Sequence, residues 1–459
     1  MTQAMLERFM EKSPITVMAR AVFEYSMSAE RIDALFHRHA VSQYEGQLLF
    51  STAVDLLGLT VLRSRNSVRE AYEIDKEAVG VTIKSVYDKL ANTELQVSRA
   101  LVRDTATQLE PIIHSLKAEL PPLLPGYRAK ILDGKHLNGT EHRLKETRTL
   151  NSSPLPGQWL VVLDPQQMIA IDAIPCEDAY SQERKLLTEI LPTVAKSDLW
   201  IADRNFCTTM FLFGLAERKA CFVIRQHGST LSGKRLIGKR RRVGRCDTGM
   251  VYEQNMEIDD PNTGATITVR RISIELNQPT RDGDTVIHVL TNLPAAVDAV
   301  KVADIYRKRW TVETAFQELG QAFNAEIDTL CYPRAALLAY CIALMMYNTL
   351  SVVKASLRTV HGEEASPERI SGYYLASEIK AIQGGMMVAI TPDQWRRRFG
   401  KITPRQMAAF LRECAAHVPI RRFLKNKRGP KRPPPKRTGG LREKHVSTAR
   451  LLAQRNGKN

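Results

Sequence analysis

Three acidic residues that lie far apart in the sequence, Asp133, Asp203 and Glu313, are the strongest candidates for metal-dependent chemistry. Carboxylate oxygens are the ligands that Mg²⁺ prefers in proteins. Two divalent cations about 3.5–4 Å apart activate a water or hydroxyl and stabilise the leaving oxygen of a phosphodiester. The sequence separations between these acids carry no information by themselves. What matters is where the surrounding elements place each carboxylate.

Two of the three acids follow short apolar segments of strand character. Residues 128–132 precede Asp133, and residues 198–202 precede Asp203. If the first and fourth strands of a mixed sheet lie side by side, their carboxyl ends bring both acids to the edge where ligands gather in open α/β sheets. For either acid alone, a turn or cap role is the simpler interpretation, as it is for Asp164, which ends a strand before a predicted hairpin turn.

The third acid belongs to a predicted helix over residues 300–323. Tyr306, Arg309 and Glu313 are spaced i, i+3 and i+7, which places them on one helix face, whereas Glu318 lies further around. Arg309 and Glu313 also fit an ordinary i,i+4 ion pair. The spacing alone therefore leaves a structural salt bridge and a catalytic helix as open alternatives.

The order of the elements predicts a mixed α/β sheet. We expect strands at 128–132, 159–163, 168–174, 198–202 and 220–224, with helices at 181–195 and 206–218. Antiparallel strands followed by parallel β-α units produce such a sheet. Residues 226–292 interrupt the order with a basic run at 234–245 and three β-type runs at 250–258, 266–276 and 285–290. We interpret this segment as an all-β insertion.

The remaining regions are predicted to be mostly helical. We expect a helical N-terminal DNA-binding domain at 1–95, a catalytic core at 96–225 and 293–356 around the insertion at 226–292, and a C-terminal region at 357–459, weakly helical as far as residue 419. Residues 81–90 fit either the recognition helix of a helix-turn-helix unit or a plain amphipathic helix. The apolar stretch 335–353 is long enough to cross a membrane but contains Asn348, Thr349 and Ser351, so we predict a buried core helix.

The composition is that of a globular protein with a strongly basic end. The 459 residues include 66 Lys and Arg against 49 Asp and Glu, a formal charge of +17, and 44% hydrophobic residues. These values exclude a disordered chain and a disulfide-rich miniprotein. Residues 421–459 hold 14 basic residues and one acid, a net charge of +13, and include an extended Pro-rich basic segment at 431–437. The excess charge predicts a polyanionic partner, either nucleic acid or an acidic membrane surface.

The cysteine pattern and the N-terminus indicate a cytoplasmic protein. Seven scattered cysteines without a Cys-x-x-Cys pair are typical of a reducing compartment and argue against a structural zinc site. His37 and His39 are interpreted as a solvated pair. Charged residues interrupt the first 18 residues, so no signal peptide is predicted. The absence of a Walker A loop makes nucleotide-driven chemistry improbable.

The segment Tyr306-Arg307-Lys308-Arg309-Trp310-Thr311-Val312-Glu313 resembles the Tyr-x2-Arg-x3-Glu signature of DDE transposases of bacterial insertion-sequence family four. Leu132-Asp133-Gly134 and Ile201-Ala202-Asp203-Arg204-Asn205-Phe206 are similar to the two aspartate motifs of that family, and residues 445–450 to its C-termini. The resemblance covers residues 15–455. It implies a ribonuclease-H-like catalytic domain with a β-rich insertion between the second aspartate and the glutamate.

The resemblance also implies an activity and site roles. Asp133, Asp203 and Glu313 are expected to be catalytic and to bind Mg²⁺, for which Mn²⁺ can substitute. DNA contacts are expected at Tyr306, Arg309, Trp310, Arg240, Arg241 and Arg242, and in the basic tail. Trp310 fits either base stacking or simple packing. Seven residues beyond Glu313 the family usually has a DNA-contacting Lys, but this chain has Gly320, so that role is open to Gln317, Gln321 or a basic residue elsewhere.

The expected function is cut-and-paste DNA transposition in the bacterial cytoplasm, at the nucleoid when DNA is bound. Hydrolysis at an element end frees a 3′ hydroxyl, which forms a hairpin end and later attacks target DNA. A homodimer is expected to hold two element ends, and no membrane partner is expected. Two alternatives remain at this stage: a metal-dependent nuclease or resolvase without strand transfer, and a non-catalytic DNA-binding protein derived from a transposase.

Overall fold

The computed structural model describes residues 3–43, 46–228, 231, 233–280, 283–426 and 429. The chain divides into two compact units, Met1–Leu424 and Lys425–Asn459. The account below concerns the first unit. The predicted basic segment 431–437 and the motif at 445–450 lie outside the described residues.

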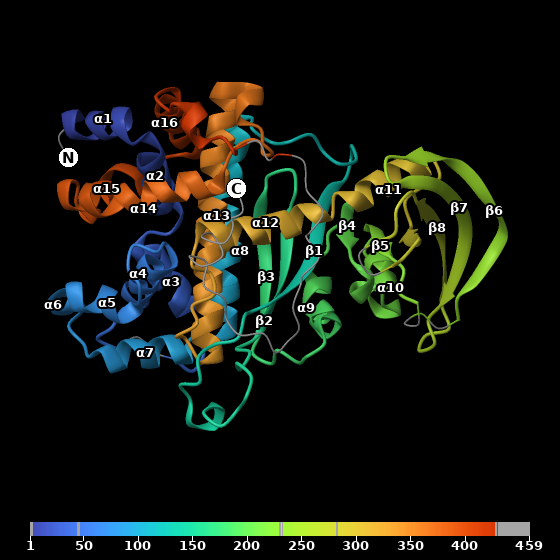
Figure 1. The fold of residues 1–459 in the computed structure, drawn as a ribbon, viewed down its shortest axis with the longest axis horizontal. Helices are drawn as coiled ribbons and strands as arrows, with labels where there is room; N and C mark the ends of the chain where they lie inside the picture. Colours follow the sequence, from blue (N-terminus) through green and yellow to red (C-terminus); the bar gives the residue numbers. More distant parts are fainter. Residues whose placement is uncertain are drawn as a thin grey trace, which may run out of the picture. The chain divides into compact units, whose positions relative to one another are not determined.

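A sheet of nine described strands organises the first unit (Figure 1). Its strands are β1 (Arg128–His136), β2 (Gln158–Asp164), β3 (Ile169–Cys176), β4 (Asp198–Ala202), β5 (Cys221–Arg225), β6 (Arg235–Cys246), β7 (Gly249–Asp259), β8 (Thr266–Leu276) and β9 (Val286–Thr291). The spatial order is β3-β2-β1-β4-β5-β9-β8-β7-β6. β1 is parallel to β4 and β4 to β5, whereas the other pairs are antiparallel. This topology confirms the predicted ribonuclease-H-like mixed α/β sheet with β1 and β4 side by side.

The two faces of the central strands bury different residues, as the period of two along a strand requires. Ile131 and Ile201 belong to the large core on one face, together with the helices α8 (Leu95–Leu116), α12 (Trp310–Ala322) and α13 (Pro333–His361). Leu132 and Ala202 face a smaller core with α9 (Leu187–Ile190) and α10 (Thr209–Glu217). The predicted helix at 181–195 is broken into α9 and the 3-10 turns η2 (Glu183–Leu186) and η3 (Leu191–Thr193), the latter containing a proline.

The predicted β insertion extends the main sheet. β9 is antiparallel to β5, so β6–β9 continue the sheet beyond the core strands, at the right in Figure 1. The basic run at 234–245, interpreted from the sequence only as a charged segment, forms the edge strand β6. Its arginines reach acids on neighbouring strands, with Arg235 2.5 Å from Glu257 and Arg241 3.1 Å from Glu253. Basic side chains and a short β-bulge suit an exposed sheet edge.

The apolar stretch at 335–353 lies in α13, which is the described helix long and apolar enough to cross a membrane. In this structure 94% of its apolar window is buried inside the protein. The Asn348 side chain accepts a hydrogen bond from the backbone N–H of Ala170 at 2.7 Å and donates to the Ala170 carbonyl at 2.8 Å. A polar residue satisfied by β3 belongs in a packed core, which confirms the predicted core helix.

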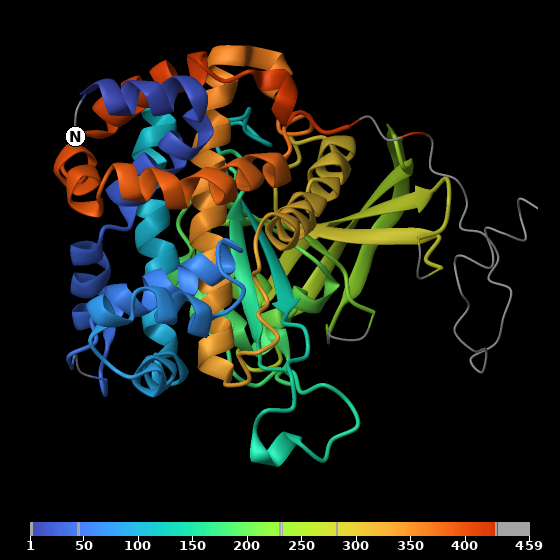
Figure 2. The same cartoon turned by 60° about the vertical axis from the view of Figure 1, so that its left-hand side comes forward.

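The helices from both ends of the first unit form one layer beside α8 and α13 (Figure 2). They are α1 (Gln3–Lys12), α2 (Pro14–Ser26), α3 (Ala29–His39), α4 (Phe50–Val61), α5 (Val68–Ile74), α6 (Lys76–Val79), α7 (Ile83–Asn92), α14 (Gly372–Ala389), α15 (Pro392–Phe399) and α16 (Pro404–Ala416). α2 contacts α14, α15 and α16. The region before residue 419 was predicted to be only weakly helical. That prediction was wrong, because the capping boxes Thr391–Gln394 and Thr403–Gln406 start α15 and α16.

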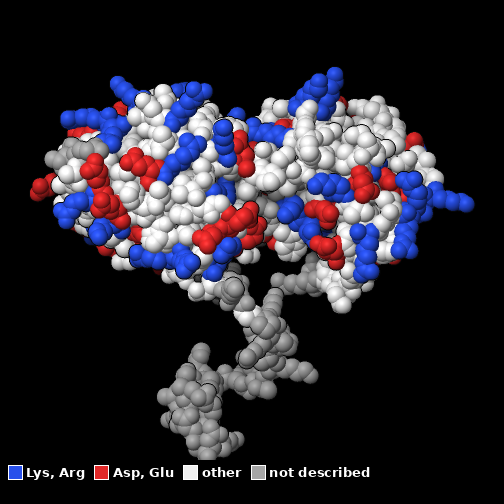
Figure 3. All heavy atoms as spheres, turned by 90° about the horizontal axis from the view of Figure 1, so that it is seen from above, with Lys and Arg blue, Asp and Glu red and all other residues white. Residues whose placement is uncertain are grey.

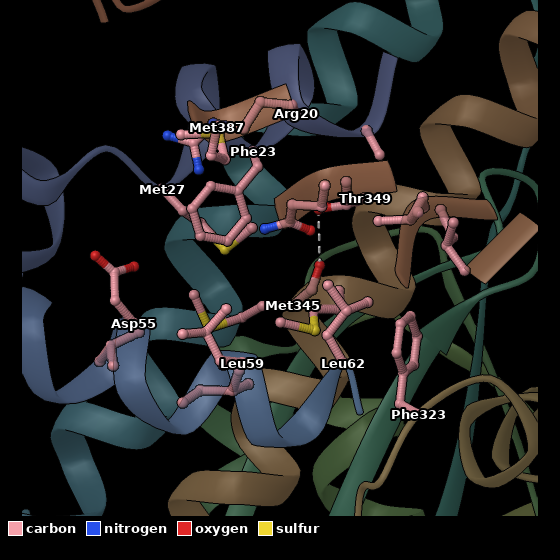
Figure 4. Close-up of a pocket in the computed structure, with 18 of the residues that line it drawn as sticks. Arg20, Phe23, Met27, Asp55, Leu59, Leu62, Phe323, Met345, Thr349 and Met387 are labelled. Carbon is pink, nitrogen blue, oxygen red and sulfur yellow. Dashed lines mark hydrogen bonds between the residues drawn. The ribbon is translucent and has the colours of Figure 1, made fainter. Parts of the chain in front are cut away.

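A cavity of about 300 Å³ lies between α2, α4, α13 and α14 (Figure 4). Phe23, Met27, Leu59 and Met345 are among its apolar lining residues. Asp55 also lines it; the residue is exposed, and desolvation by the protein around its carboxyl raises the pKa of that group to about 6. The remaining short elements are η1 (Lys145–Thr147), η4 (Arg204–Phe206), η5 (Gly362–Ala365), η6 (Ile420–Phe423) and α11 (Ala299–Arg307).

Candidate active site

The two aspartates lie on neighbouring strands. Asp203 follows the last residue of β4, whereas Asp133 lies within β1, which continues to His136, so the predicted strand end at Asp133 is wrong. Leu132 and Ala202 are partners in the parallel register, and Asp133 and Asp203 are the residues that follow them. Neighbouring strands are about 4.8 Å apart. Asp133 and Asp203 are two residues beyond Ile131 and Ile201, so both point toward the face of the sheet that carries α12. The structure thus brings these two predicted residues together.

Gly134 is needed because another acid packs against it. A Cβ at this position would overlap the Glu183 carboxyl group, which comes from η2. His136 Nδ1 lies 3.6 Å from the same carboxyl group. Sequence reasoning missed Glu183, and the glycine after Asp133 was the one signal of a close approach at this point.

Glu313 reaches the aspartates through Arg309. The Arg309 guanidinium places Nη1 3.3 Å from Asp133 Oδ2 and Nη2 2.7 Å from Glu313 Oε1. The arginine is 8% exposed, and the Glu313 side chain 32%. The i,i+4 ion pair between Arg309 and Glu313 is therefore present, and Arg309 also contacts Asp133 on β1.

The helix that carries this signature is interrupted. Residues 300–323 were predicted as one helix, but α11 ends at Arg307 and α12 begins at Trp310. Lys308 and Arg309 form a turn between them, with Arg309 as the residue preceding α12. The three side chains of the predicted face nevertheless stay together, because Arg309 interacts with both Tyr306 and Glu313. Arg309 reaches Asp133 on β1 from the same place.

The electrostatics of the site reflect an excess of carboxylates. Burial raises the pKa of Asp133 to about 7; the Arg309 charge opposes this shift, while Glu313 and Asp203 add to it. Burial alone would lower the pKa of Arg309, but Tyr306 and the three acids outweigh it and raise that pKa. The site favours bound positive charge, which Arg309 supplies here.

The donor set fits a hard cation such as Mg²⁺, because all three side chains offer carboxylate oxygens. Among the described residues, however, no three His, Cys, Asp or Glu side chains lie close enough together to hold a metal ion. Arg309 lies between Asp133 and Glu313 and accounts for their separation. The metal-binding role of Asp133, Asp203 and Glu313 stays a prediction.

Two aromatic residues of the signature differ in exposure. Tyr306 is 6% exposed, and burial together with the Asp203 charge raises its pKa to about 12. The predicted DNA contact at Tyr306 therefore finds no open surface here and stays a prediction. Trp310 is 59% exposed, and the Arg309 guanidinium carbon lies 5.6 Å from its ring centroid. Packing does not explain Trp310.

The predicted arginines of the insertion lie on the exposed strand β6. Arg240 is 2.7 Å from Glu275 and lies over the Tyr252 ring at 3.8 Å. Arg241 pairs with Glu253 as described above, and Arg242 Nη2 contacts the Met250 sulfur at 3.8 Å. Figure 3 shows Lys and Arg side chains projecting at the end of the molecule formed by the insertion.

Sequence reasoning missed further cations on neighbouring strands. Burial lowers the pKa of His288 to about 4, helped by the charges of Arg271, Arg240 and Arg225. Burial and Arg240 also lower the pKa of Arg271. These residues come from β5, β6, β8 and β9. They are far apart in the sequence, so a search for runs of basic residues does not find them as a group. Their mutual repulsion marks a positive patch on the insertion.

Comparison with known proteins finds a family for part of the chain. Residues 125–349 match the family model described as "Transposase DDE domain". This segment is therefore similar to transposase DDE domains. It spans the chain from just before β1 to the middle of α13 and contains Asp133, Asp203 and Glu313.

A search of the solved structures finds a similarity to the piggyBac transposase synaptic complex with hairpin DNA, determined by cryo-electron microscopy. The two chains share 11% sequence identity, the match covers 85% of this chain and 83% of that chain, and the TM-score is 0.41. A search of curated proteins found no sequence match.

Proposed function

We propose that this chain is a DNA transposase that hydrolyses phosphodiester bonds at element ends and joins the freed ends to target DNA. The proposal is supported by two neighbouring aspartates and a glutamate linked to one of them by Arg309, all in the segment that matches the DDE-domain model. Asp133 and Asp203 are neighbours on β1 and β4, and Arg309 ties Glu313 to Asp133. The cut-and-paste pathway through hairpin ends is the finer form of the proposal, carried by the resemblance to insertion-sequence family four.

Mg²⁺, or Mn²⁺ in its place, would be held by Asp133, Asp203 and Glu313. When bound, it would lower the pKa of an attacking water and stabilise the leaving oxygen. Asp133 has a pKa near neutrality, so it is ready to give up its proton where a cation compensates the charge. Arg309 positions Glu313, and its planar guanidinium suits a phosphate oxygen once DNA is present. The exposed Trp310 ring is available to stack on an unpaired base.

DNA binding is assigned to the basic surfaces. Arg240, Arg241 and Arg242 on β6 and the positive patch of Arg225 and Arg271 would contact backbone phosphates, and the basic tail would add affinity. Because each neutralised phosphate releases counterions, binding should weaken steeply with salt. Two protomers would hold two element ends as a homodimer, in the bacterial cytoplasm and at the nucleoid when DNA is bound.

The proposal is tested with a labelled duplex taken from the DNA that flanks the coding sequence on either side. We expect Mg²⁺-dependent cleavage at the element end, and joining of a precleaved labelled end to a target plasmid. Asp203→Asn should abolish both reactions and leave end binding in gel-shift assays unchanged. Cleavage without joining would favour a nuclease or resolvase, and binding without cleavage would favour a non-catalytic DNA-binding protein.

A further inference from the structure

One face of α12 leads away from the candidate active site along the protein surface. Trp310, Thr314, Gln317 and Gly320 are exposed and recur every three or four residues. Glu313 lies beside the start of this stripe. At 1.5 Å per residue, the seven residues from Glu313 to Gly320 span about 10 Å along the axis. This distance is about three base steps of a DNA strand at 3.4 Å per step.

The far end of the stripe carries a cation from another part of the chain. Arg63, between α4 and α5, donates from Nη2 to the carbonyl oxygens of Gly320 at 3.3 Å and Phe323 at 3.1 Å. The Arg63 side chain is exposed. No carboxylate of the described residues pairs with it, and the described residues leave its Nη1 and Nε groups without a partner. Most of the guanidinium is thus available to an anion from solvent.

The backbone holds Arg63 at this place by tertiary contacts. Arg63 has a φ of 60°, in the left-handed region that non-glycine residues rarely adopt. The Asn324 N–H donates to the Val61 carbonyl at 2.7 Å, which fastens the end of α4 to the end of α12. Leu62 and Phe323, the residues next to these contacts, both line the cavity of Figure 4. The positive φ of Arg63 belongs to the cap that ends α4, in which the Ser64 N–H donates to the Leu59 carbonyl at 2.9 Å. The cap and the contact with Asn324 together fix where the Arg63 side chain leaves the backbone.

Gly320 leaves room for a ligand beside Arg63. A Cβ at Gly320 would meet no atom within 4 Å, so the last turns of α12 offer bare backbone there. Capping of the α12 carbonyls explains one of the donors of Arg63. It does not explain why the other donors face open space on the stripe that begins at the candidate active site.

We propose that Arg63 binds a backbone phosphate of the element end, within about three nucleotides of the bond that is cleaved. The helical layer would thereby supply a positioning residue to the candidate active site. This inference rests on the proposed function. The Lys that is usual in the family is replaced here by Gly320. The inference assigns the DNA contact of that Lys to Arg63 in preference to Gln317 or Gln321.

The test uses the full chain and element-end duplexes, each carrying one uncharged methylphosphonate at successive positions around the cleavage site. We expect Arg63→Ala to weaken end binding about 10-fold, since a hydrogen-bonded charge pair contributes about that factor. One methylphosphonate should weaken wild-type binding equally and have no further effect on Arg63→Ala. Arg65→Ala is the matched control, because Arg65 donates to Ser64 and does not contact α12.

A second variant separates phosphate binding from helix capping. Adding Gly320→Lys to Arg63→Ala should restore most of the binding, because a Lys side chain fits the open space and supplies the cation, whereas it cannot cap the α12 carbonyls. The inference is overturned if every methylphosphonate affects wild type and Arg63→Ala alike, or if the double variant binds no better than Arg63→Ala. Binding is measured without cleavage, so failure of the proposed chemistry would show separately as loss of cleavage by the wild type.

Discussion

Asp133 and Asp164 lie on the neighbouring strands β1 and β2, and each is held by an arginine. Asp133 lies within β1, whereas Asp164 ends β2. Asp133 is 3.3 Å from Arg309, and Asp164 is 3.1 Å from Arg128. Burial raises the pKa of both carboxyls. Residue type, a raised pKa and an arginine partner are thus shared by a candidate catalytic acid and an acid that shapes a turn.

The difference lies in what satisfies each carboxylate. Asp164 accepts hydrogen bonds from the backbone N–H groups of Gln166 and Gln167 at 2.9 and 3.1 Å, in its own hairpin turn. Asp133 accepts one backbone hydrogen bond, from Gly134, and faces the charges of Asp203 and Glu313. A locally satisfied acid stabilises the fold. An acid surrounded by other acids leaves the structure short of positive charge, which a metal ion or Arg309 can supply.

The largest expected effect comes from removing the charge of Asp133. Asp133→Asn should reduce end cleavage at least about 10³-fold, because metal-assisted stabilisation is worth several kcal/mol. Thermal unfolding at pH 8 without metal should show no loss of stability, since the neutral group relieves repulsion with its acidic neighbours. Retained cleavage would show that Asp133 is not a catalytic residue, and Asp133 and Asp164 would then not differ in function.

Asp164→Asn should show the reverse behaviour. The substitution weakens the contact to Arg128 and two acceptor sites in a buried turn, so we expect the free energy of unfolding to fall by about 1–3 kcal/mol. Urea denaturation measures this loss. Cleavage per folded molecule should remain that of the wild type. A loss of cleavage beyond the loss of folded protein would show that Asp164 and Asp133 do not differ in function.

Asp55 sharpens the comparison, because desolvation raises the pKa of this exposed acid although it has no proposed catalytic role. Its folded pKa of about 6 lies above the unfolded value of 3.8, so the folded state is favoured by protonation below pH 3.8 and loses that advantage as the pH rises through 6. Asp55→Asn should therefore be more stable than the wild type at pH 7–8 and nearly equal at pH 4. Because the carboxyl faces an open cavity, solvent screening limits the gain to about 1 kcal/mol.

Chemical denaturation at both pH values measures this difference, and cleavage at pH 7.5 should be unchanged. If Asp55→Asn abolished cleavage, Asp55 would have to be a functional residue as well, although it is not one of the three candidate catalytic acids. An equal effect at pH 4 and pH 8 would point to packing rather than charge.

Several elements could be predicted because local sequence alone determines them. The strand at 198–202 is found where the apolar run placed it, and the order of strands and helices led to the correct sheet. The capping boxes of α15 and α16 were readable in principle, through Thr followed by Gln three residues later, but were overlooked. β6 was missed because its basic residues hide the alternation, and their partners lie on β7 and β8.

The sequence by itself determined that Asp133 and Asp203 belong to adjacent strand segments, that the signature is helical, and that α13 belongs in a core. Hydrophobic periodicity and local hydrogen bonding specify these features within a few residues. Only the tertiary structure decided that Arg309 bridges β1 and α12, that Glu183 packs on Gly134, and that Arg63 reaches the end of α12. Such contacts join residues up to 260 positions apart. They depend on the sheet register and on the bend between α11 and α12, which no local pattern encodes.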